Sequence, residues 1–374
     1  MVYTLSPLIK YFGVLGLVPW AEQPSRQLAQ KLYTFAIVLV QILSYALAMS
    51  APLKDLDLPV SQLVSDIVFT AHMVTTSVIL LQAMFQYEEF YDFCMELKSL
   101  NLRFQREVKV PANSLPRMRS LKLLFLGSAS IFTLIPGIYM GIITNSYVGY
   151  FLYSLGSVLI NRCQTVLLLI NAELLTFHAE LLCQQLQQIL SCRQMRYNCI
   201  LEGDCQRLTS VELLLSLKQA YMELYGLYNR FNALYGWSML FIFVVMFLDS
   251  TVNIYWTLLS LSDAYSYVYI GISCASFMPQ LALMLALCSS GEFCKRQHEL
   301  IGSQIRGVSC ALQVQKQSVH QGYSALVVEF SMQVEQDPLV INAEGFMDID
   351  YGLLMSIFTA MVTYLIVLMQ FGTF

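Results

Sequence analysis

The final 24 residues of the chain, 351–374, contain no charged side chain. A helix rises about 1.5 Å per residue, so this segment would be roughly 36 Å long, enough to cross a hydrocarbon core of about 30 Å. We therefore predict a membrane-spanning helix at the end of the chain, around which the rest of the fold is organised.

Polar side chains recur along this segment every three or four residues, and with Ile366 included they average about 3.5 residues apart. That spacing forms one stripe on a helix that supercoils with its neighbours. A Gln amide has no partner in lipid, so the stripe should avoid lipid. It faces either another helix of the same chain, as polar packing, or copies of itself around a symmetry axis, as a pore. The members are Ser356, Thr359, Thr363, Ile366, Gln370 and Thr373.

The remainder of the chain is also strongly apolar. Of its 374 residues, 57% are hydrophobic and only 12% are charged, against about 25% in soluble proteins, which indicates an all-α polytopic membrane protein. The net charge of −4 gives no reason to expect a nucleic-acid partner. We predict seven transmembrane helices, at 32–50, 62–86, 121–144, 148–176, 236–260, 266–289 and 351–374.

Lysine and arginine are distributed unevenly between these spans. They concentrate at the N-terminus and after the second, fourth and sixth spans, whereas Lys54 alone lies between the first and second. The positive-inside rule then predicts a cytosolic N-terminus and an extracellular C-terminus. Apolar residues at helical spacing in 177–191 and 211–235 predict that membrane helices continue into a cytosolic helical base.

This organisation divides the chain into four parts. A cytosolic N-terminus precedes six transmembrane helices that carry an outward-facing ligand pocket and cytosolic extensions. A cytosolic helical anchor segment then leads into the final helix. The cytosolic N-terminus is 1–31, the six helices are 32–289, the anchor segment is 290–350 and the final helix is 351–374.

Two ionisable residues lie near the middle of predicted spans, Arg162 in the fourth and Asp249 in the fifth. Charged groups are costly in lipid, so either the two pair and lock their helices together, or they line a ligand cavity. Aromatic and polar residues nearby suit a small ring-bearing ligand, although an interfacial aromatic belt would also account for any single Tyr or Trp. The candidate pocket residues are His72, Tyr153, Asn161, Arg162, Asp249, Asn253, Trp256 and Tyr265.

Acidic residues crowd the start of the last span: Glu344, Asp348 and Asp350. In a symmetric oligomer they would surround the inner mouth of a pore, where rings of carboxylates favour cations. The alternative is a solvated acidic turn that caps the helix N-terminus, and Asp348 or Asp350 could do both.

No pattern indicates an enzyme. The four histidines are scattered without metal-ligand spacing, and no HExxH, GxSxG or P-loop sequence is present. We therefore predict no catalytic residues, no metal site and no cofactor.

The end of the chain resembles a known family. Thr363 and Tyr364 are followed by five apolar residues and then by Gln370 and Phe371, which is similar to the C-terminal signature of insect gustatory receptors. The lead-in 345–350 is also similar, with Met347 at a position where that family has an aromatic residue.

The resemblance implies a homotetrameric or heterotetrameric ligand-gated cation channel in the plasma membrane of a sensory-neuron dendrite, surrounded by lipid. Each subunit would bind a small-molecule tastant in an outward-facing pocket among spans two to six. The family's seventh segment has a cytosolic half, expected near 312–336. The final helix would line the pore, with its extracellular gate at Gln370 and Phe371. The implied pore and gate residues are Thr359, Thr363, Ile366, Gln370 and Phe371.

The expected pocket is more aromatic and aliphatic than a sugar site needs, so bitter compounds or contact pheromones are favoured as ligands. One alternative is an odorant-receptor-type channel subunit, which the C-terminal signature disfavours. The other is a metabotropic seven-helix receptor, which the predicted cytosolic N-terminus opposes.

Overall fold

The computed structural model describes residues 11–18, 24–50, 59–108, 117–135, 148–195, 210–261, 268–314 and 321–372. Nearly all of this part of the chain is helical. A five-residue π-helical turn, η1 (Phe104–Val108), follows α4. The helices are α2 (Pro24–Ser50), α3 (Pro59–Phe85), α4 (Tyr87–Arg103), α5 (Arg117–Phe132), α7 (Val148–Met195), α9 (Val211–Leu261), α10 (Val268–Val314), α11 (Gln321–Gln336) and α12 (Tyr351–Gly372).

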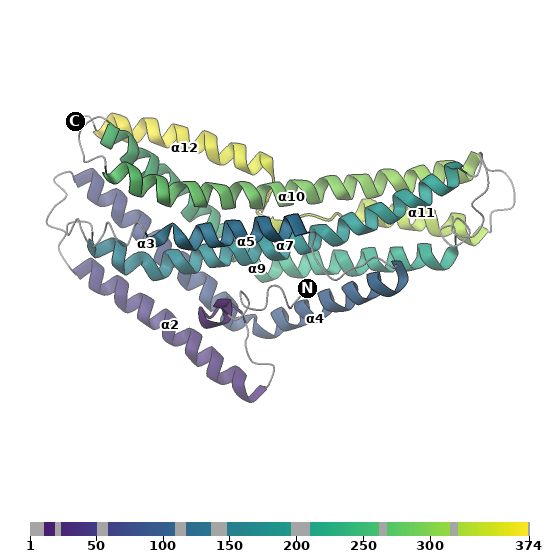
Figure 1. The fold of residues 1–374 in the computed structure, drawn as a ribbon, viewed down its shortest axis with the longest axis horizontal. Helices are drawn as coiled ribbons and strands as arrows, with labels where there is room; N and C mark the ends of the chain where they lie inside the picture. The colour runs from purple at the N-terminus through teal and green to yellow at the C-terminus, as the bar shows by residue number, and fades with distance from the viewer. Residues whose placement is uncertain are drawn as a thin grey trace.

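Three helices run most of the length of the molecule. Helices α7, α9 and α10 contain 48, 51 and 47 residues, so each is about 70 Å long or more, over twice the thickness of a hydrocarbon core. In Figure 1 they lie along the long axis, with α2, α3, α5 and α12 around their left half and α4 and α11 around their right half. The predicted continuation of membrane helices into a second helical layer is thus present as unbroken helices.

Six helices of the described part are long and apolar enough to cross a membrane. They lie in α2, α3, α7, α9, α10 and α12 and overlap with six of the seven predicted spans. The remaining predicted span, 121–144, begins as α5, and its end falls in 136–147, outside the described ranges.

Helix α7 forms the centre of the bundle. Every side chain from Ile160 to Ala179 is buried, and α7 contacts α2, α3, α5, α9 and α10. Apolar residues lie on all sides of α7, so neighbouring helices can cover it on every side. The polar residues that α7 carries are therefore buried with it and need partners on the surrounding helices.

A short β-hairpin connects α11 to α12. Strands β1 (Asn342–Ala343) and β2 (Met347–Asp348) pair antiparallel. Glu344 and Gly345 have φ angles of 51° and 73°, and the Phe346 amide donates to the Ala343 carbonyl at 2.9 Å. Positive φ at both central residues defines a type I′ turn. The sequence predicted an acidic turn here, but not the pairing of the strands.

Candidate functional site

One face of α12 packs against the rest of the chain. Met361 is buried, and Leu365 and Leu368 pack against Tyr255 and Trp256 of α9. These side chains fall on one side of the helix because positions three, four and seven residues apart share a face. The packing fixes which way the opposite side of α12 points.

The polar stripe lies on that opposite side. Residues two apart on a helix differ by about 200°, so Thr359 and Thr363 flank the direction opposite Met361. Both are exposed, as are Ser356, Ile366 and Gln370. The Thr359 and Thr363 hydroxyls each donate at 2.9 Å to the carbonyl four residues earlier in α12. Within the described part of the chain, Thr359 and Thr363 face away from the helix on which α12 packs, which favours the pore alternative. The side chain of Phe371 lies outside the described ones.

The acidic residues before α12 contact Lys295 of α10, which was not predicted from the sequence. Lys295 Nζ of α10 lies 3.0 Å from Asp348 Oδ2 and 2.5 Å from Asp350 Oδ2. Asp350 Oδ1 also accepts a hydrogen bond from the Leu353 amide at 2.9 Å, so Asp350 caps α12, one of the two roles predicted for it. Glu344 lies exposed in the hairpin turn. Lys295 offsets part of the negative charge at this end of α12.

The environment of Asp350 favours its charged form. Burial by itself would raise the pKa of Asp350, but the hydrogen bonds from Lys295 and from the Leu353 amide outweigh it and hold the pKa below its ordinary value. The carboxylate is therefore ionised at neutral pH and holds both its lysine and its helix.

Four of the candidate pocket residues form one connected polar network between α3, α7 and α9. Asn161 Nδ2 lies 3.1 Å from His72 Nδ1, and Thr76 Oγ1 donates to Asn161 Oδ1 at 3.0 Å. His72 Nε2 lies 3.8 Å from Asp249 Oδ1, which accepts from Asn253 Nδ2 at 2.9 Å. The sequence placed His72, Asn161, Asp249 and Asn253 on three different helices, and the fold brings them together.

Arg162 takes partners at the C-terminal end of α5, Ser130 within the helix and Thr133 just after it. Its Nη1 donates to the Ser130 carbonyl at 2.8 Å and to Thr133 Oγ1 at 3.0 Å. The side chain is buried, so these bonds join α7 to α5 inside the bundle. No direct ion pair joins Arg162 to Asp249 among the described residues, and Asp249 lies against His72 and Asn253.

The space around this network is small. A cavity lined by His72, Asn161 and Arg162, together with residues of α9 and α10, measures about 10 Å³, room for about one water molecule. Sites for small molecules usually measure about 300–1,000 Å³, so a ligand here requires the helices to separate. Trp256 lies apart from the cavity, beneath α12. Tyr265 and the side chain of Tyr153 lie outside the description.

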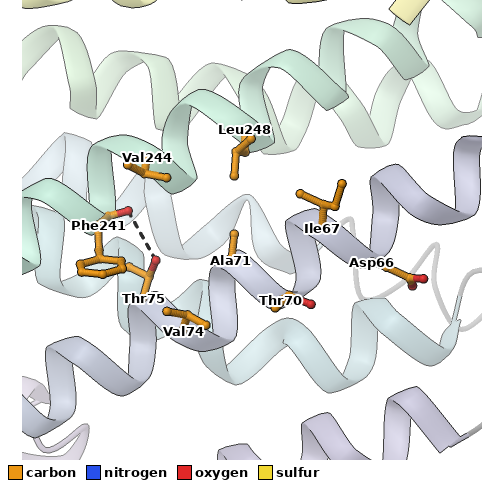
Figure 2. A pocket seen from close by; sticks show the side chains of 9 residues that line it. All are labelled: Asp66, Ile67, Thr70, Ala71, Val74, Thr75, Phe241, Val244 and Leu248. Carbon is orange, nitrogen blue, oxygen red and sulfur yellow. Dashed lines mark hydrogen bonds between the residues drawn. The ribbon is translucent and has the colours of Figure 1, made fainter. Parts of the chain in front are cut away.

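A much larger hollow opens between α3 and α9. Figure 2 shows the two helices with the hollow between their side chains, which measures about 410 Å³. Asp66 lies at one end of it, and its other lining residues are almost all apolar. The described residues contain no group of three His, Cys, Asp or Glu side chains that could hold a metal ion.

A model of the 7tm chemosensory receptor family matches residues 5–373. The chain belongs to this family. The receptor is 44% identical over 374 residues to Putative gustatory receptor 39b of Drosophila melanogaster, covering 100% of both chains. It is also 32% identical over 156 residues to Gustatory receptor 23a of the same species, covering 41% of this chain and 40% of that one.

The receptor's fold is similar to that of the insect olfactory receptor OR5 from Machilis hrabei, solved in complex with eugenol. The TM-score is 0.69 over 98% of this chain and 99% of that chain, at 15% sequence identity, which shows a common fold. The predicted family and the predicted all-α, seven-helix membrane fold are confirmed. Because members of this family are receptors, the prediction that the chain is not an enzyme is confirmed as well.

Two residues of these sites, Thr76 and Lys295, were not predicted from the sequence. Thr76 follows His72 by four residues on α3, a spacing that places both on one helix face and could have indicated it. Lys295 precedes Asp350 by 55 residues, and nothing in its local sequence indicates that contact.

Proposed function

We propose that the receptor is a gustatory receptor that assembles as a tetramer, alone or with related subunits, into a ligand-gated, non-selective cation channel. The observation that carries this proposal is the exposed polar stripe on α12, opposite the face that packs on its own subunit. Four such stripes around one axis would line a polar path through the membrane. Thr359, Thr363 and Ile366 line this pore, and Gln370 and Phe371 form its gate.

The proposed orientation places the N-terminus in the cytosol and the C-terminus outside, in the plasma membrane of a sensory-neuron dendrite. The concentration of lysine and arginine on one side of the spans supports it. Glu344 and Asp348 then lie at the cytosolic mouth, where they attract cations. Lys295 offsets part of the negative charge of these carboxylates, which agrees with a channel that selects weakly among cations.

The proposed ligand is a small tastant or contact chemical that binds at the network of His72, Asn161, Asp249 and Asn253. Apolar side chains of α9, Ile242, Val245 and Met246, line the same cavity, which favours bitter compounds or contact pheromones over sugars. The cavity of about 10 Å³ corresponds to a closed state without ligand, and binding requires α3 and α9 to part.

Helix α9 provides the connection from ligand to pore. Asp249 and Asn253 belong to the network, and Tyr255 and Trp256, within one turn after Asn253, support Leu365 and Leu368 of α12. A ligand that displaces α9 therefore moves the surface on which the outer part of α12 rests. It opens the gate only to the extent that it binds the open state more tightly than the closed one.

Cysteine accessibility tests the pore directly. Thr363→Cys and Met361→Cys would be expressed in cells and exposed to a membrane-impermeant, thiol-reactive cation while current is recorded. We expect the reagent to block most of the current of Thr363→Cys and to leave that of Met361→Cys at the wild-type level, because Met361 is buried against its own subunit. Equal block of the two variants would contradict the assignment of the stripe.

The gate has a test of its own. Gln370→Ala and Phe371→Ala should raise the current in the absence of ligand, because each removes a side chain that closes the outer end of the pore. Unchanged gating in both variants would remove these two residues from the gate without affecting the rest of the proposal.

A further inference from the structure

The hollow between α3 and α9 (Figure 2) is open to the outside of the chain rather than enclosed. Three of its apolar side chains, Ile67, Val74 and Val244, are 44–47% exposed. At about 410 Å³ it falls within the range of small-molecule sites, unlike the cavity at the polar network. Its lining residues are Asp66, Ile67, Thr70, Ala71, Val74, Thr75, Phe241, Val244 and Leu248.

The depth of the hollow follows from α3. The apolar part of this helix includes Asp66 to Phe85, and the lining residues of α3 lie between Asp66 and Thr75. The hollow therefore lies along the apolar part of α3, with Asp66 at one end of its lining (Figure 2). An amphiphile with its polar head at Asp66 would place its apolar body along the rest of this lining.

Asp66 is the charged residue that lines this hollow. Thr70 Oγ1 lies 3.2 Å from the Tyr45 hydroxyl, and Thr75 Oγ1 donates to the Phe241 carbonyl at 3.4 Å. In contrast, Asp66 Oδ1 is buried and has no hydrogen-bond partner in the part of the chain that the structure describes. A buried carboxylate oxygen without a partner is costly, and a cationic donor would relieve that cost.

We propose that this hollow binds a lipophilic amine, with its ammonium group on Asp66 and its hydrocarbon body between α3 and α9. An ammonium group supplies both the positive charge and the donors that a carboxylate accepts. The apolar body replaces lipid contacts along Val74, Val244 and Leu248. A bilayer phospholipid fits less well, since its phosphate would bring a second negative charge to Asp66. This site is separate from the tastant site proposed above and does not depend on channel activity.

Photocrosslinking would test the site. The full-length receptor, in phosphatidylcholine nanodiscs, would be labelled with dodecylamine carrying a diazirine in its chain, and the adducts would be mapped by mass spectrometry. We expect adducts on 66–75 and 241–248, removed by unlabelled dodecylamine at a concentration about tenfold below that of dodecanol. Tenfold corresponds to ~1.4 kcal/mol, at the low end for a hydrogen bond to a charged group.

Substitutions separate the contribution of the charge from that of the hollow. Asp66→Asn should raise the dodecylamine concentration for half-competition about tenfold and leave that of dodecanol unchanged. Ala71→Trp should fill the hollow and remove the adducts, whereas Leu39→Trp, on the exposed surface of α2, should not.

Three results would overturn the proposal: adducts spread evenly over the lipid-facing helices, equal competition by amine and alcohol, or no labelling of the hollow because another copy of the chain covers it. None of these results bears on ion conduction, so this inference and the proposed channel function can fail independently.

Discussion

At the scale of single residues, two glycines allow the hairpin before α12 to lie directly on the long helices. A Cβ on Gly291 of α10 would overlap the Ile349 carbonyl oxygen, and one on Gly236 of α9 would lie 2.6 Å from the Glu344 amide. Both neighbours are backbone atoms, which cannot rotate away as a side chain could. The close approach sets the position from which α12 starts.

Gly291→Ala should therefore destabilise the receptor although it replaces a helix-interior glycine. The matched control is Gly226→Ala in α9, where an added Cβ meets nothing within 4 Å and the better helix propensity of alanine should stabilise by about 0.5–1 kcal/mol. Thermal unfolding in detergent, followed by tryptophan fluorescence, should give a lower Tm for the first variant and an equal or higher one for the second. Equal stability of the two variants would refute the close approach.

The ionisation of Asp350 should make the stability of the receptor depend on pH. Because the folded state lowers the pKa of Asp350, the carboxylate contributes stability at pH values above its unfolded pKa of about 3.9. That contribution is lost as the pH falls further, through the lower folded value. In Asp350→Asn the cap persists, since asparagine caps about as well as aspartate, but this titration is absent.

The measurement is Tm against pH for the two proteins, from pH 7 downwards. Wild type should lose more Tm than Asp350→Asn below about pH 4. Parallel curves for the two proteins would show that the Lys295 contact does not stabilise the folded state.

At the scale of elements, the segment between α11 and α12 is fastened to the long helices through its backbone. Asn232 of α9 donates to the Val340 carbonyl at 2.9 Å and accepts from the Asn342 amide at 3.1 Å. The Tyr221 hydroxyl donates to the Asp337 carbonyl at 2.6 Å. Bonds to backbone groups fix the path of the segment whatever its side chains are, so motion of α9 reaches the start of α12.

Asn232→Leu should break this attachment, because it leaves two backbone groups of the segment between α11 and α12 without their partner. Each group left unsatisfied inside a protein costs about 1–3 kcal/mol, so Tm should fall clearly. The control Met222→Ala, at an exposed position of the same helix, should change Tm little. If the two variants unfold at the same temperature, water replaces the Asn232 bonds and the attachment is weak.

At the scale of the whole molecule, α12 is far less covered than the helix at the centre. Within the most apolar 18-residue stretch of each helix, 94% of the residues of α7 are buried but only 11% of those of α12. Lipid can cover the large apolar side chains on the rest of α12, but the exposed side also carries the polar residues Ser356, Thr359 and Thr363, which are not a surface for lipid. A single subunit therefore presents a surface that association would complete.

The mass of the purified receptor tests that association. One chain is 42.5 kDa, so a homotetramer has about 170 kDa of protein, which light scattering in mild detergent distinguishes from a monomer. We expect the tetramer. A monomer that remains a monomer when related subunits are co-expressed would contradict the proposed channel.

Much of the receptor follows from its sequence because the relevant signals are local. The spans are continuous apolar stretches, the stripe on the last helix is a spacing of three and four residues, and the capping role of Asp350 needs only the helix that begins after it. The C-terminal signature at 363–371 is likewise contiguous, and it gave the correct family.

The tertiary structure decided what depends on contacts between distant segments. It placed the stripe away from its own subunit, gave Arg162 partners at the end of α5, joined Lys295 to Asp348 and Asp350, and left a hollow beside Asp66. Spacing along one helix determines which residues share a face, but not which neighbour that face meets. That choice results from packing three helices of about 70 Å against one another, and no local stretch of sequence contains it.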